Sequence, residues 1–312
     1  MDGVICIDKP AGITSHDVVA QARHILRHPR VGHAGTLDPF ATGLLVLLVG
    51  RATRLTQFLN GLEKEYEAII RLGYATDTAD ITGKPLSDPQ GGKNWAKVEA
   101  RDELERALAS LRGEIDQVPP MYSAKKQGGR KLYELARKGE EVERLPVRVT
   151  IHEFEAMKPD GKWLKDNLDG TFDFEARVVC SSGTYIRTLA EDFGKQLNVG
   201  AHLAELRRTR VGDFAIDNAR TLVQLKTSVA EEALGKILYK PDEALSRLPA
   251  IDAGEEDVRR LRHGMNLQVS GESWTEGEPV RIRDAKGNLI AVGTFDSVNS
   301  VLHPSVVLSH ED

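Results

Sequence analysis

The sequence predicts an α/β (α+β) protein with a large mixed domain and a small, mostly β domain at the C-terminal end. Segments with alternating apolar residues, typical of strands, are interspersed with segments whose apolar residues recur at helical spacing. The length of 312 residues suggests one large domain or two. A proline-bounded segment, 241–249, precedes several short strand patterns. We therefore place the first domain at residues 1–246 and the second at residues 250–312.

The composition is that of an ordinary globular protein, with 40% hydrophobic and 29% charged residues. No apolar run approaches the roughly 20 residues needed to span a bilayer, and the N-terminus lacks a signal-like apolar core. The two cysteines, Cys6 and Cys180, form no CxxC pair and indicate a reducing compartment. We expect no membrane attachment and a cytoplasmic location.

The net charge of -5 originates in the C-terminal segment. Residues 251–312 carry 6 basic and 11 acidic side chains, whereas the rest of the chain is balanced, with 36 of each. This balance argues against a globally basic nucleic-acid binder. A site for a polyanion must therefore arise from local clustering in the larger domain.

The first elements are a short apolar strand at 4–7, a turn at 8–12, and a helix capped by Thr14 or Ser15. Ser15-His16-Asp17 has the residue types of a hydrolase triad, but triad members approach from separate elements. Capping of the helix is the preferred interpretation. The apolar stripe of this helix comprises Val18, Val19, Ala22 and Ile25.

The glycine-rich stretch 32–45 holds the first candidate for chemistry. Asp38 is followed by Pro39, which favours an extended backbone, and glycines flank it on both sides. The apolar run 44–49 then predicts a strand buried on both faces. Asp38 is thus a carboxylate on a shaped loop at the end of a core strand. A plain Asp-Pro turn is the alternative.

Residues 51–62 are predicted to be helical, and residues 64–72 alternate as a strand with Tyr66 on its apolar face. The polar loop 76–80 contains two aspartates, for which a capped turn is favoured over a cation site. A helix with the stripe Leu104, Leu108 and Leu111 ends at Gly113.

A basic insertion follows at about 121–148. Its cations outnumber its acids around a Gly-Gly pair at 128–129 and include Lys125, Lys126, Arg130 and Lys131. A solvated charged face and a segment that grips phosphates are equally compatible with this pattern.

Strands are predicted at 146–154 and 171–180, followed by a helix that Thr184 can cap and that runs to about Leu197. Arg187 then lies in the first helical turn, where the helix dipole disfavours a cation, so it needs a carboxylate or phosphate partner. Arg207, Arg208 and Arg210 follow beside Leu206. In the C-terminal domain we expect a helix at 255–262, strands at 266–270, 279–283, 289–295 and 304–308, and a hairpin turn at 284–288.

The chain resembles the TruB family of tRNA pseudouridine synthases. The matching motifs, in the order of the family, are Asp8-Lys9-Pro10, Thr14-Ser15-His16-Asp17, residues 32–43, Lys64-Glu65-Tyr66, residues 76–80, residues 121–124, residues 183–188 and Gly200-Ala201-His202. The resemblance implies a mixed, largely antiparallel sheet with flanking helices around a central cleft, and a PUA-like β-barrel at the C-terminal end. It also implies isomerisation of the T-loop uridine at tRNA position 55 to pseudouridine.

The resemblance assigns roles to individual residues. Asp38 falls on the nucleophile of the family, Tyr66 on its stacking tyrosine, and Arg187 on its pocket arginine. Tyr185 and Leu206 fall on further pocket residues, and His33 falls on the histidine that helps hold the flipped T-loop. The basic insertion is similar to the thumb that grips RNA.

The chemistry of pseudouridine formation agrees with this set of residues. The reaction is redox-neutral and moves one bond within a single substrate, so we expect neither a cofactor nor a metal. It needs a carboxylate, which Arg187 can counter-charge in a water-poor pocket. Tyr66 offers an aromatic face to an extruded base, worth roughly 1–3 kcal/mol. Phosphate contacts are expected from Lys125, Lys126, Arg130, Lys131, Arg207 and Arg208.

Three hypotheses remain. The leading one is a stand-alone, monomeric enzyme that acts on the T-arm of tRNA and needs no protein partner. A second is an RNA-binding or tRNA-folding protein in which Asp38 is secondary. A third is a guide-RNA-dependent isomerase, although the basic insertion favours the tRNA enzyme.

Overall fold

A computed structural model of the chain describes residues 1–88, 101–120, 126–127, 130–131, 144–157, 161–271 and 273–308.

A ten-stranded sheet forms the centre of the structure, with the path β1-β3-β11-β4-β10-β8-β5. In addition, β2 pairs with β3, β12 with β11 and β9 with β10. Its strands are β1 (Gly3–Lys9), β2 (Val31–Ala34), β3 (Thr42–Val49), β4 (Lys64–Leu72), β5 (Gly113–Gln117), β8 (Val147–Ala156), β9 (Lys165–Asp166), β10 (Phe172–Cys180), β11 (Ala201–Val211) and β12 (Phe214–Ala215). Within the described part of this sheet, only β3 and β11 pair in parallel. The predicted mixed, largely antiparallel sheet is confirmed.

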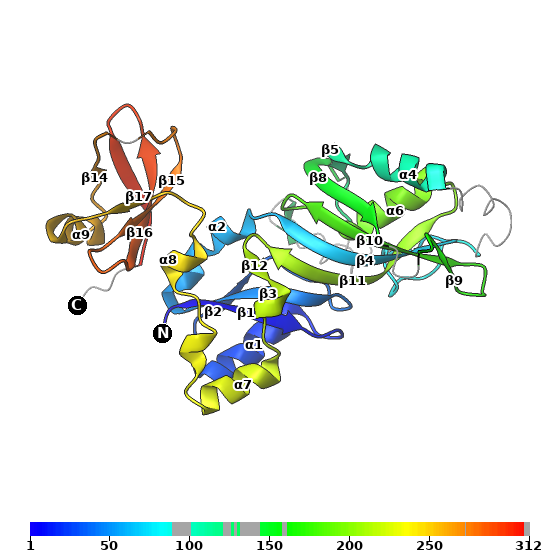
Figure 1. The fold of residues 1–312 in the computed structure, drawn as a ribbon, viewed down its shortest axis with the longest axis horizontal. Helices are drawn as coiled ribbons and strands as arrows, with labels where there is room; N and C mark the ends of the chain where they lie inside the picture. Colours follow the sequence, from blue (N-terminus) through cyan, green and yellow to red (C-terminus); the bar gives the residue numbers. More distant parts are fainter. Residues whose placement is uncertain are drawn as a thin grey trace.

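Helices cover the two ends of the sheet (Figure 1). Near β1 lie α1 (Ser15–Leu26), the 3-10 turn η1 (Gly50–Leu55), α2 (Thr56–Asn60), η2 (Ile216–Asn218), α7 (Leu222–Ala230), η3 (Leu234–Lys236) and α8 (Pro241–Ala244). Near β8 and β10 lie α4 (Arg101–Ser110) and α6 (Ile186–Gln196). No helix in the described ranges is both long and apolar enough to span a membrane.

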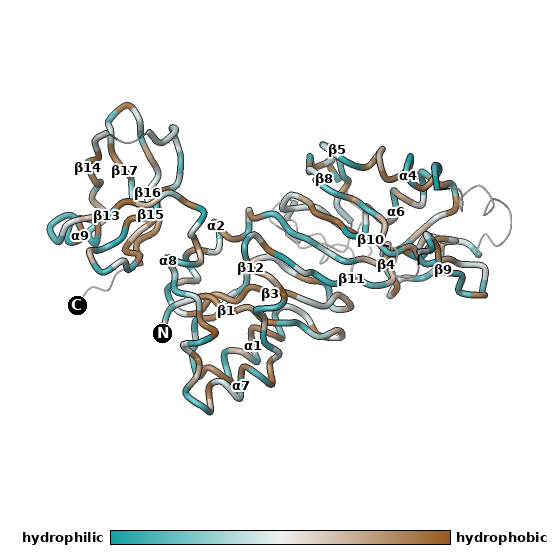
Figure 2. Tube along the Cα trace, viewed as in Figure 1, coloured by the Kyte–Doolittle hydropathy of each residue, from teal (hydrophilic) through white to brown (hydrophobic). Residues whose placement is uncertain are grey.

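The alternation of apolar residues explains how the sheet is buried. In β3 all residues from Gly43 to Val49 are buried, because one set packs against α1 and α7 and the other lies in an apolar cluster with η1, α2 and β12. Figure 2 shows the hydrophobic residues along β1 and β3. In β4 the residues Tyr66, Ala68, Ile70 and Leu72 face a core built with α4 and α6. Both burial patterns confirm the predictions from periodicity.

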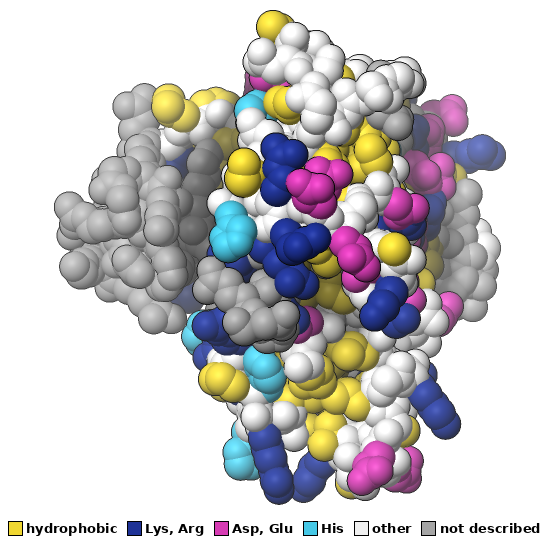
Figure 3. Space-filling view, turned by 90° about the vertical axis from the view of Figure 1, so that its left-hand side faces the viewer, with side chains coloured by type: hydrophobic (Ala, Val, Ile, Leu, Met, Phe, Trp, Pro, Cys, Tyr) yellow, Lys and Arg dark blue, Asp and Glu magenta, His cyan; other side chains and the backbone are white. Residues whose placement is uncertain are grey.

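The C-terminal unit is a five-stranded sheet with the order β13-β15-β16-β17-β14 and the helix α9 (Glu255–Arg262). Its strands are β13 (Ala250–Asp252), β14 (Leu267–Gln268), β15 (Pro279–Arg283), β16 (Leu289–Asp296) and β17 (Val301–Val307). The predicted hairpin turn lies between β15 and β16, where Asp284 accepts hydrogen bonds from the amides of Lys286 and Asn288. Figure 3 shows positive and negative side chains intermixed on the face that carries this unit.

Local predictions differ from the structure at a few positions. Thr184 does not cap α6: the N-cap is Tyr185, and the Thr184 hydroxyl donates to the Ser181 carbonyl at 2.9 Å. The predicted helix 51–62 is a 3-10 turn followed by the short α2. The strand β13 has no counterpart among the predictions, because three residues are too short for a periodic pattern to register.

Candidate active site

The loop that carries Asp38 joins β2 to β3, and hydrogen bonds from Ser15 and Lys9 hold its backbone. The hydroxyl group of Ser15 accepts a hydrogen bond from the Leu37 amide at 2.9 Å and donates one to the Leu37 carbonyl at 3.1 Å. The Lys9 ammonium group donates to the Pro39 carbonyl at 3.2 Å. The backbone on both sides of Asp38 is therefore held in place. The residue that caps α1 is Thr14, not Ser15, and it forms a capping box with Asp17. This agrees with helix capping, the interpretation preferred over a hydrolase triad.

Two glycines of this loop are required by their surroundings. Gly43 has a φ of +98°, and a Cβ at this position would lie 2.3 Å from the Arg208 carbonyl oxygen. Gly35 has a φ of +81°, and its carbonyl accepts a hydrogen bond from Arg208 Nη2 at 2.9 Å. A side chain at Gly43 would push β3 away from β11 at the point where the two strands pair.

Arg187 binds Asp38 side-on with two nitrogen atoms. Its Nε lies 2.9 Å from Asp38 Oδ2, and its Nη2 donates to Asp38 Oδ1 at 3.3 Å. Its Nη1 lies 3.4 Å from Oδ2 of Asp80 and also donates to the Thr78 carbonyl at 3.3 Å. Arg187 is only 5% exposed, so a buried cation lies between two carboxylates. The partnership of Asp38 and Arg187 that the sequence predicted is present.

Asp80 is a site residue that sequence reasoning missed. It is 4% exposed, and its Oδ1 accepts hydrogen bonds from the Thr78 hydroxyl at 2.8 Å and from the amide and hydroxyl of Thr82 at 3.0 and 2.6 Å. These bonds confirm the capped turn predicted for this loop. The signal that could have identified Asp80 is the motif 76–80 itself, which is part of the resemblance to the TruB family.

The ionisable groups around Asp38 have shifted pKa values. Burial raises the pKa of Asp38 above its ordinary value, and the neighbouring Asp80 adds to the rise, while the positive charge of Arg187 opposes it. Lys9 is fully buried and donates to three backbone carbonyls, those of Pro10, Ile13 and Pro39. Desolvation lowers the pKa of Lys9 to about 8, although the Asp38 carboxylate opposes this shift.

Tyr66 and Leu206 form an apolar wall near the loop. Both belong to one buried cluster with Leu37 and Ala41, which lie on either side of Asp38. Tyr66 is 7% exposed, and desolvation raises the pKa of its hydroxyl group. The ring that the sequence placed on the core face of β4 therefore lies beside the Asp38 loop.

Two further residues, the predicted T-loop histidine His33 and the predicted pocket tyrosine Tyr185, lie on β2 and at the start of α6. His33 lies on β2 and is partly buried; burial lowers its pKa, and its Nδ1 has no hydrogen-bond partner among the described residues. Tyr185 is the N-cap of α6, and its amide donates to the Gln117 side-chain oxygen at 3.0 Å. The backbone at the start of α6, and with it Arg187, is thereby tied to β5.

The predicted phosphate contacts divide into three groups. Lys125 lies outside the described residues, while Lys126, Arg130 and Lys131 belong to a two-stranded pair, β6 (Lys126–Gln127) and β7 (Arg130–Lys131). Arg207 is partly exposed and pairs with Asp8 at 2.8 Å. Arg208 is 1% exposed and donates to backbone carbonyls, so the prediction of a phosphate contact at Arg208 is wrong: no surface is left to meet one.

Comparison with known proteins places this geometry in a family. Residues 23–186 match the TruB family pseudouridylate synthase (N terminal domain), and residues 187–246 match the tRNA pseudouridylate synthase B C-terminal domain. The chain belongs to the TruB family. The Asp38 loop and Tyr66 lie within the first match, and Arg187 opens the second.

The chain is similar over nearly its full length to curated TruB-family members. It is 41% identical to tRNA pseudouridine synthase B of Solibacter usitatus (strain Ellin6076), covering 99% of this chain and 100% of that protein. It is 43% identical to the protein of the same name of Bacillus thuringiensis (strain Al Hakam), covering 86% and 85%.

Solved structures of similar fold come from larger assemblies. The crystal structure of a Cbf5-Nop10-Gar1 complex contains a chain with a TM-score of 0.75 and 28% identity, covering 98% of this chain and 85% of that one. The archaeal box H/ACA sRNP Nop10-Cbf5 complex contains another, with a TM-score of 0.72 and 28% identity.

In this TruB-family site the nucleophile candidate is accessible while its partner is not. The Asp38 side chain is 34% exposed, whereas Arg187 and Asp80 are buried beneath it. A carboxylate fixed in this way can meet a bound molecule without reorienting, since its partner is held by a second acid. The arrangement fits one reacting carboxylate with fixed orientation, not a pair of carboxylates that share acid and base roles.

Proposed function

We propose that this protein isomerises uridine at position 55, in the T-loop of tRNA, to pseudouridine. The observation that carries the proposal is the Asp38–Arg187–Asp80 arrangement in a chain of the TruB family, with Tyr66 in the wall next to it. The reaction breaks the bond from C1′ to N1 of the base and forms the bond from C1′ to C5, while C5 loses a proton and N1 gains one. Atoms and electrons balance within one substrate, so the reaction requires no cofactor.

Each residue has a role in this proposal. Asp38 is the nucleophile, and Arg187 keeps its carboxylate charged and oriented. The target base must leave its stack at a cost of a few kcal/mol, and the aromatic face of Tyr66 with the apolar side chain of Leu206 receives it. Tyr185 lines the pocket, and His33 occupies the space that the base vacates. Lys125, Lys126, Arg130, Lys131 and Arg207 contact phosphates.

Residues 1–246 act as the catalytic domain in this proposal, with the basic insertion at about 121–148, and residues 250–312 as a PUA-like domain. The five-stranded C-terminal sheet with its own apolar core supports this division. The protein works as a monomer without a protein partner or a guide RNA. The curated relatives named tRNA pseudouridine synthase B, with 41% and 43% identity, support this choice over the 28% identical chains from guide-RNA assemblies.

The test uses the purified protein and unmodified tRNA transcript, with pseudouridine mapped at single-nucleotide resolution. We expect conversion at position 55 without any added protein, RNA or cofactor. Conversion elsewhere only, or activity that appears only when partner proteins and a guide RNA are added, would contradict the proposal. A second role in tRNA folding is favoured by the basic insertion, and a tRNA-folding assay with an Asp38→Asn variant measures it separately from catalysis.

A further inference from the structure

Arg208 is a buried cation without an anionic partner. It lies on β11 with 1% of its surface exposed, and no carboxylate of the described residues lies within ion-pair distance of it. Its Nε donates to the Leu44 carbonyl at 2.7 Å and its Nη2 to the Gly35 carbonyl at 2.9 Å. A buried charge is costly unless its hydrogen bonds are satisfied, so an arginine at this position calls for an explanation beyond packing.

The two carbonyls that Arg208 binds lie at the two ends of the catalytic loop. Gly35 precedes Asp38 by three residues, and Leu44 follows it in the buried part of β3. The Gly35 contact is close: a Cβ added there would lie 3.3 Å from Arg208 Nη1. On this side Arg208 therefore fixes the span of the loop that displays Asp38.

On its other side Arg208 meets the stacking residue of the site. Arg208 and Tyr66 are paired across the antiparallel strands β11 and β4, so their side chains lie on the same face of the sheet. Desolvation raises the pKa of the Tyr66 hydroxyl group, and the positive charge of Arg208 opposes this rise. The guanidinium group that binds the Asp38 loop thus lies on the same face of the sheet as the tyrosine.

Arginine fits this task for geometric reasons. Its planar fork presents several N–H groups in fixed directions, so two carbonyl acceptors, one in the loop and one in β3, are held at a constant separation. A lysine has the same charge but a single flexible head, and it cannot maintain these contacts together. Lys64, the buried neighbour on β4, instead donates to the Asn60 and Leu62 carbonyls and does not reach the loop carbonyls that Arg208 binds.

We infer that Arg208 is a positioning residue for the reaction, which sets the Asp38 loop and the Tyr66 ring at the separation that one extruded uridine requires. This inference rests on the proposed function. A phosphate contact at Arg208 would affect the affinity for tRNA, whereas a positioning contact affects the rate of the chemical step.

The test compares Arg208→Lys with the parent protein in single-turnover assays at saturating tRNA, with tRNA affinity measured separately by filter binding. We expect the rate of pseudouridine formation to fall by about 10- to 100-fold, as for a misplaced reacting group, while the Kd for tRNA changes less than threefold. A rise in Kd of about 10- to 100-fold with an unchanged saturated rate would overturn the inference, since a phosphate contact would give that result.

A matched control separates positioning from stability. Arg281 in the C-terminal unit has an 11% exposed side chain and likewise donates to backbone carbonyls, those of Leu248 at 3.0 Å and Asp242 at 3.2 Å. Arg281→Lys should lower the melting temperature and leave the saturated rate unchanged. If Arg208→Lys and Arg281→Lys slow the reaction equally, the effect is general destabilisation and the inference fails.

A second variant keeps the inference testable if Arg208→Lys folds poorly. Tyr66→Phe preserves the ring and removes only the hydroxyl group, whose residue is paired with Arg208 across the two strands, so we expect a slower saturated rate with an unchanged Kd. In the Tyr66→Phe background, Arg208→Lys should cost at least threefold less than in the parent, because the two changes act on one pair of neighbouring residues. A full rate for Tyr66→Phe, or strictly multiplicative losses, would overturn the inference. Absence of activity in the parent protein would instead contradict the proposed function itself.

Discussion

At the scale of single residues, the orientation of Asp38 depends on a second, buried acid, Asp80. Asp80 receives Arg187 Nη1 at 3.4 Å, and hydrogen bonds from Thr78 and Thr82 hold Asp80 in turn. The Arg187 side chain is therefore held in one orientation, in which Nε and Nη2 face Asp38. Through these contacts, the turn in the polar loop 76–80 limits the orientations that the Asp38 carboxylate can adopt.

We predict that Asp80→Asn slows pseudouridine formation by about 10- to 100-fold, because Arg187 loses an anionic partner and its fork is less fixed. The affinity for tRNA should stay within a few-fold of that of the parent. Single-turnover rates and filter binding measure the two effects. Thr82→Ala, which removes one hydrogen bond to Asp80 and no charge, is the control and should show a smaller loss.

The pH dependence of the reaction should report the ionisation of Asp38. Its pKa is raised, chiefly by burial, so the active carboxylate form is lost at a higher pH than for an ordinary aspartate. The saturated rate should fall as the pH decreases through that raised pKa. In Arg187→Met the opposing positive charge is gone, and the acidic limb of the rate profile should move further towards neutral pH. A limb that does not move would contradict the assigned ion pair.

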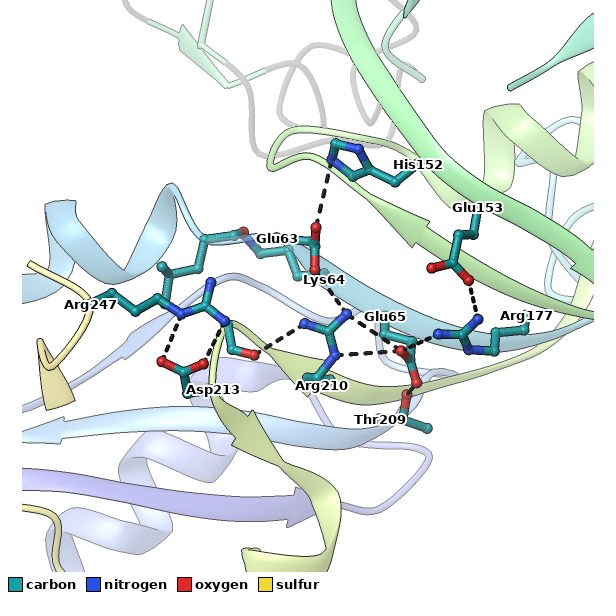
Figure 4. A network of polar contacts seen from close by, with 12 residues as sticks. Glu63, Lys64, Glu65, His152, Glu153, Arg177, Thr209, Arg210, Asp213 and Arg247 are labelled. Atoms are coloured by element: carbon teal, nitrogen blue, oxygen red, sulfur yellow. Dashed lines mark hydrogen bonds and ion pairs between the residues drawn. The ribbon is translucent and has the colours of Figure 1, made fainter. Parts of the chain in front are cut away.

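At the scale of elements, the strand β4 serves two surfaces at once. Its apolar face presents Tyr66, while its other face carries Glu65 in a network of charges (Figure 4). Glu65 binds Arg177 at 2.9 Å and Arg210 at 3.4 Å, and it accepts a hydrogen bond from Thr209 at 3.0 Å. This network joins β4 to β10 and β11 behind the site, so it contributes to the rigidity of the strand that carries the ring.

We predict that Glu65→Gln lowers the free energy of unfolding by about 1–3 kcal/mol, because Arg177 and Arg210 lose a partly buried partner. Burial raises the pKa of Glu65, but hydrogen bonds from Arg177 and Thr209 outweigh it, and the net pKa is lowered. The contribution is thus present above the unfolded-state pKa and is lost as the pH falls through the folded-state pKa. Denaturant unfolding at neutral and acidic pH measures it. A difference between parent and variant that grows on acidification would refute this assignment.

The periodicity of the sequence predicted β1, β3, β4, β8, β10, α1, α4 and α6, but it did not predict β2, β5, β11 or α7, nor which charges are buried. Both faces of β3 and the core face of β4 follow from alternation alone, and Asp38, Tyr66 and Arg187 follow from motifs. Arg208 has the same residue type as its neighbour Arg207, yet one is buried and the other pairs with Asp8 at the surface. Strand alternation places Arg207 and Arg208 on opposite faces of β11. It cannot show that Arg208 binds carbonyls in β3 and in the loop after β2, because these segments are distant in the sequence. Asp80 was missed for the same reason, since its partner lies more than a hundred residues away.

At the scale of the whole molecule, the candidate site and the basic residues proposed to bind phosphates both belong to the larger domain. The large sheet holds the site, whereas the C-terminal sheet shares an apolar cluster with η1 and α2 and is fastened by Arg51 and Arg54, which donate to the Leu308 and Val307 carbonyls at 2.5 Å. The net charge of -5 lies in that C-terminal segment. Affinity for a polyanion must therefore come chiefly from the basic residues of the larger domain.

We predict that replacing Lys125, Lys126, Arg130 and Lys131 with glutamine weakens tRNA binding and lowers its dependence on salt. Each lost phosphate contact should reduce the slope of log affinity against log salt concentration by about 0.7–0.9. The saturated single-turnover rate should change little, since Asp38, Arg187 and Arg208 are untouched. An unchanged slope would show that these side chains face solvent and do not bind phosphates.

The most direct test of the central claim is the effect of Asp38→Asn on pseudouridine formation in purified tRNA. The amide keeps the shape of the side chain and removes the charge that Arg187 orients. We predict that the parent protein converts the T-loop uridine completely, that Asp38→Asn yields no detectable pseudouridine, and that its tRNA affinity stays within about tenfold. Substantial pseudouridine from the Asp38→Asn protein would contradict the assignment of Asp38 as the nucleophile.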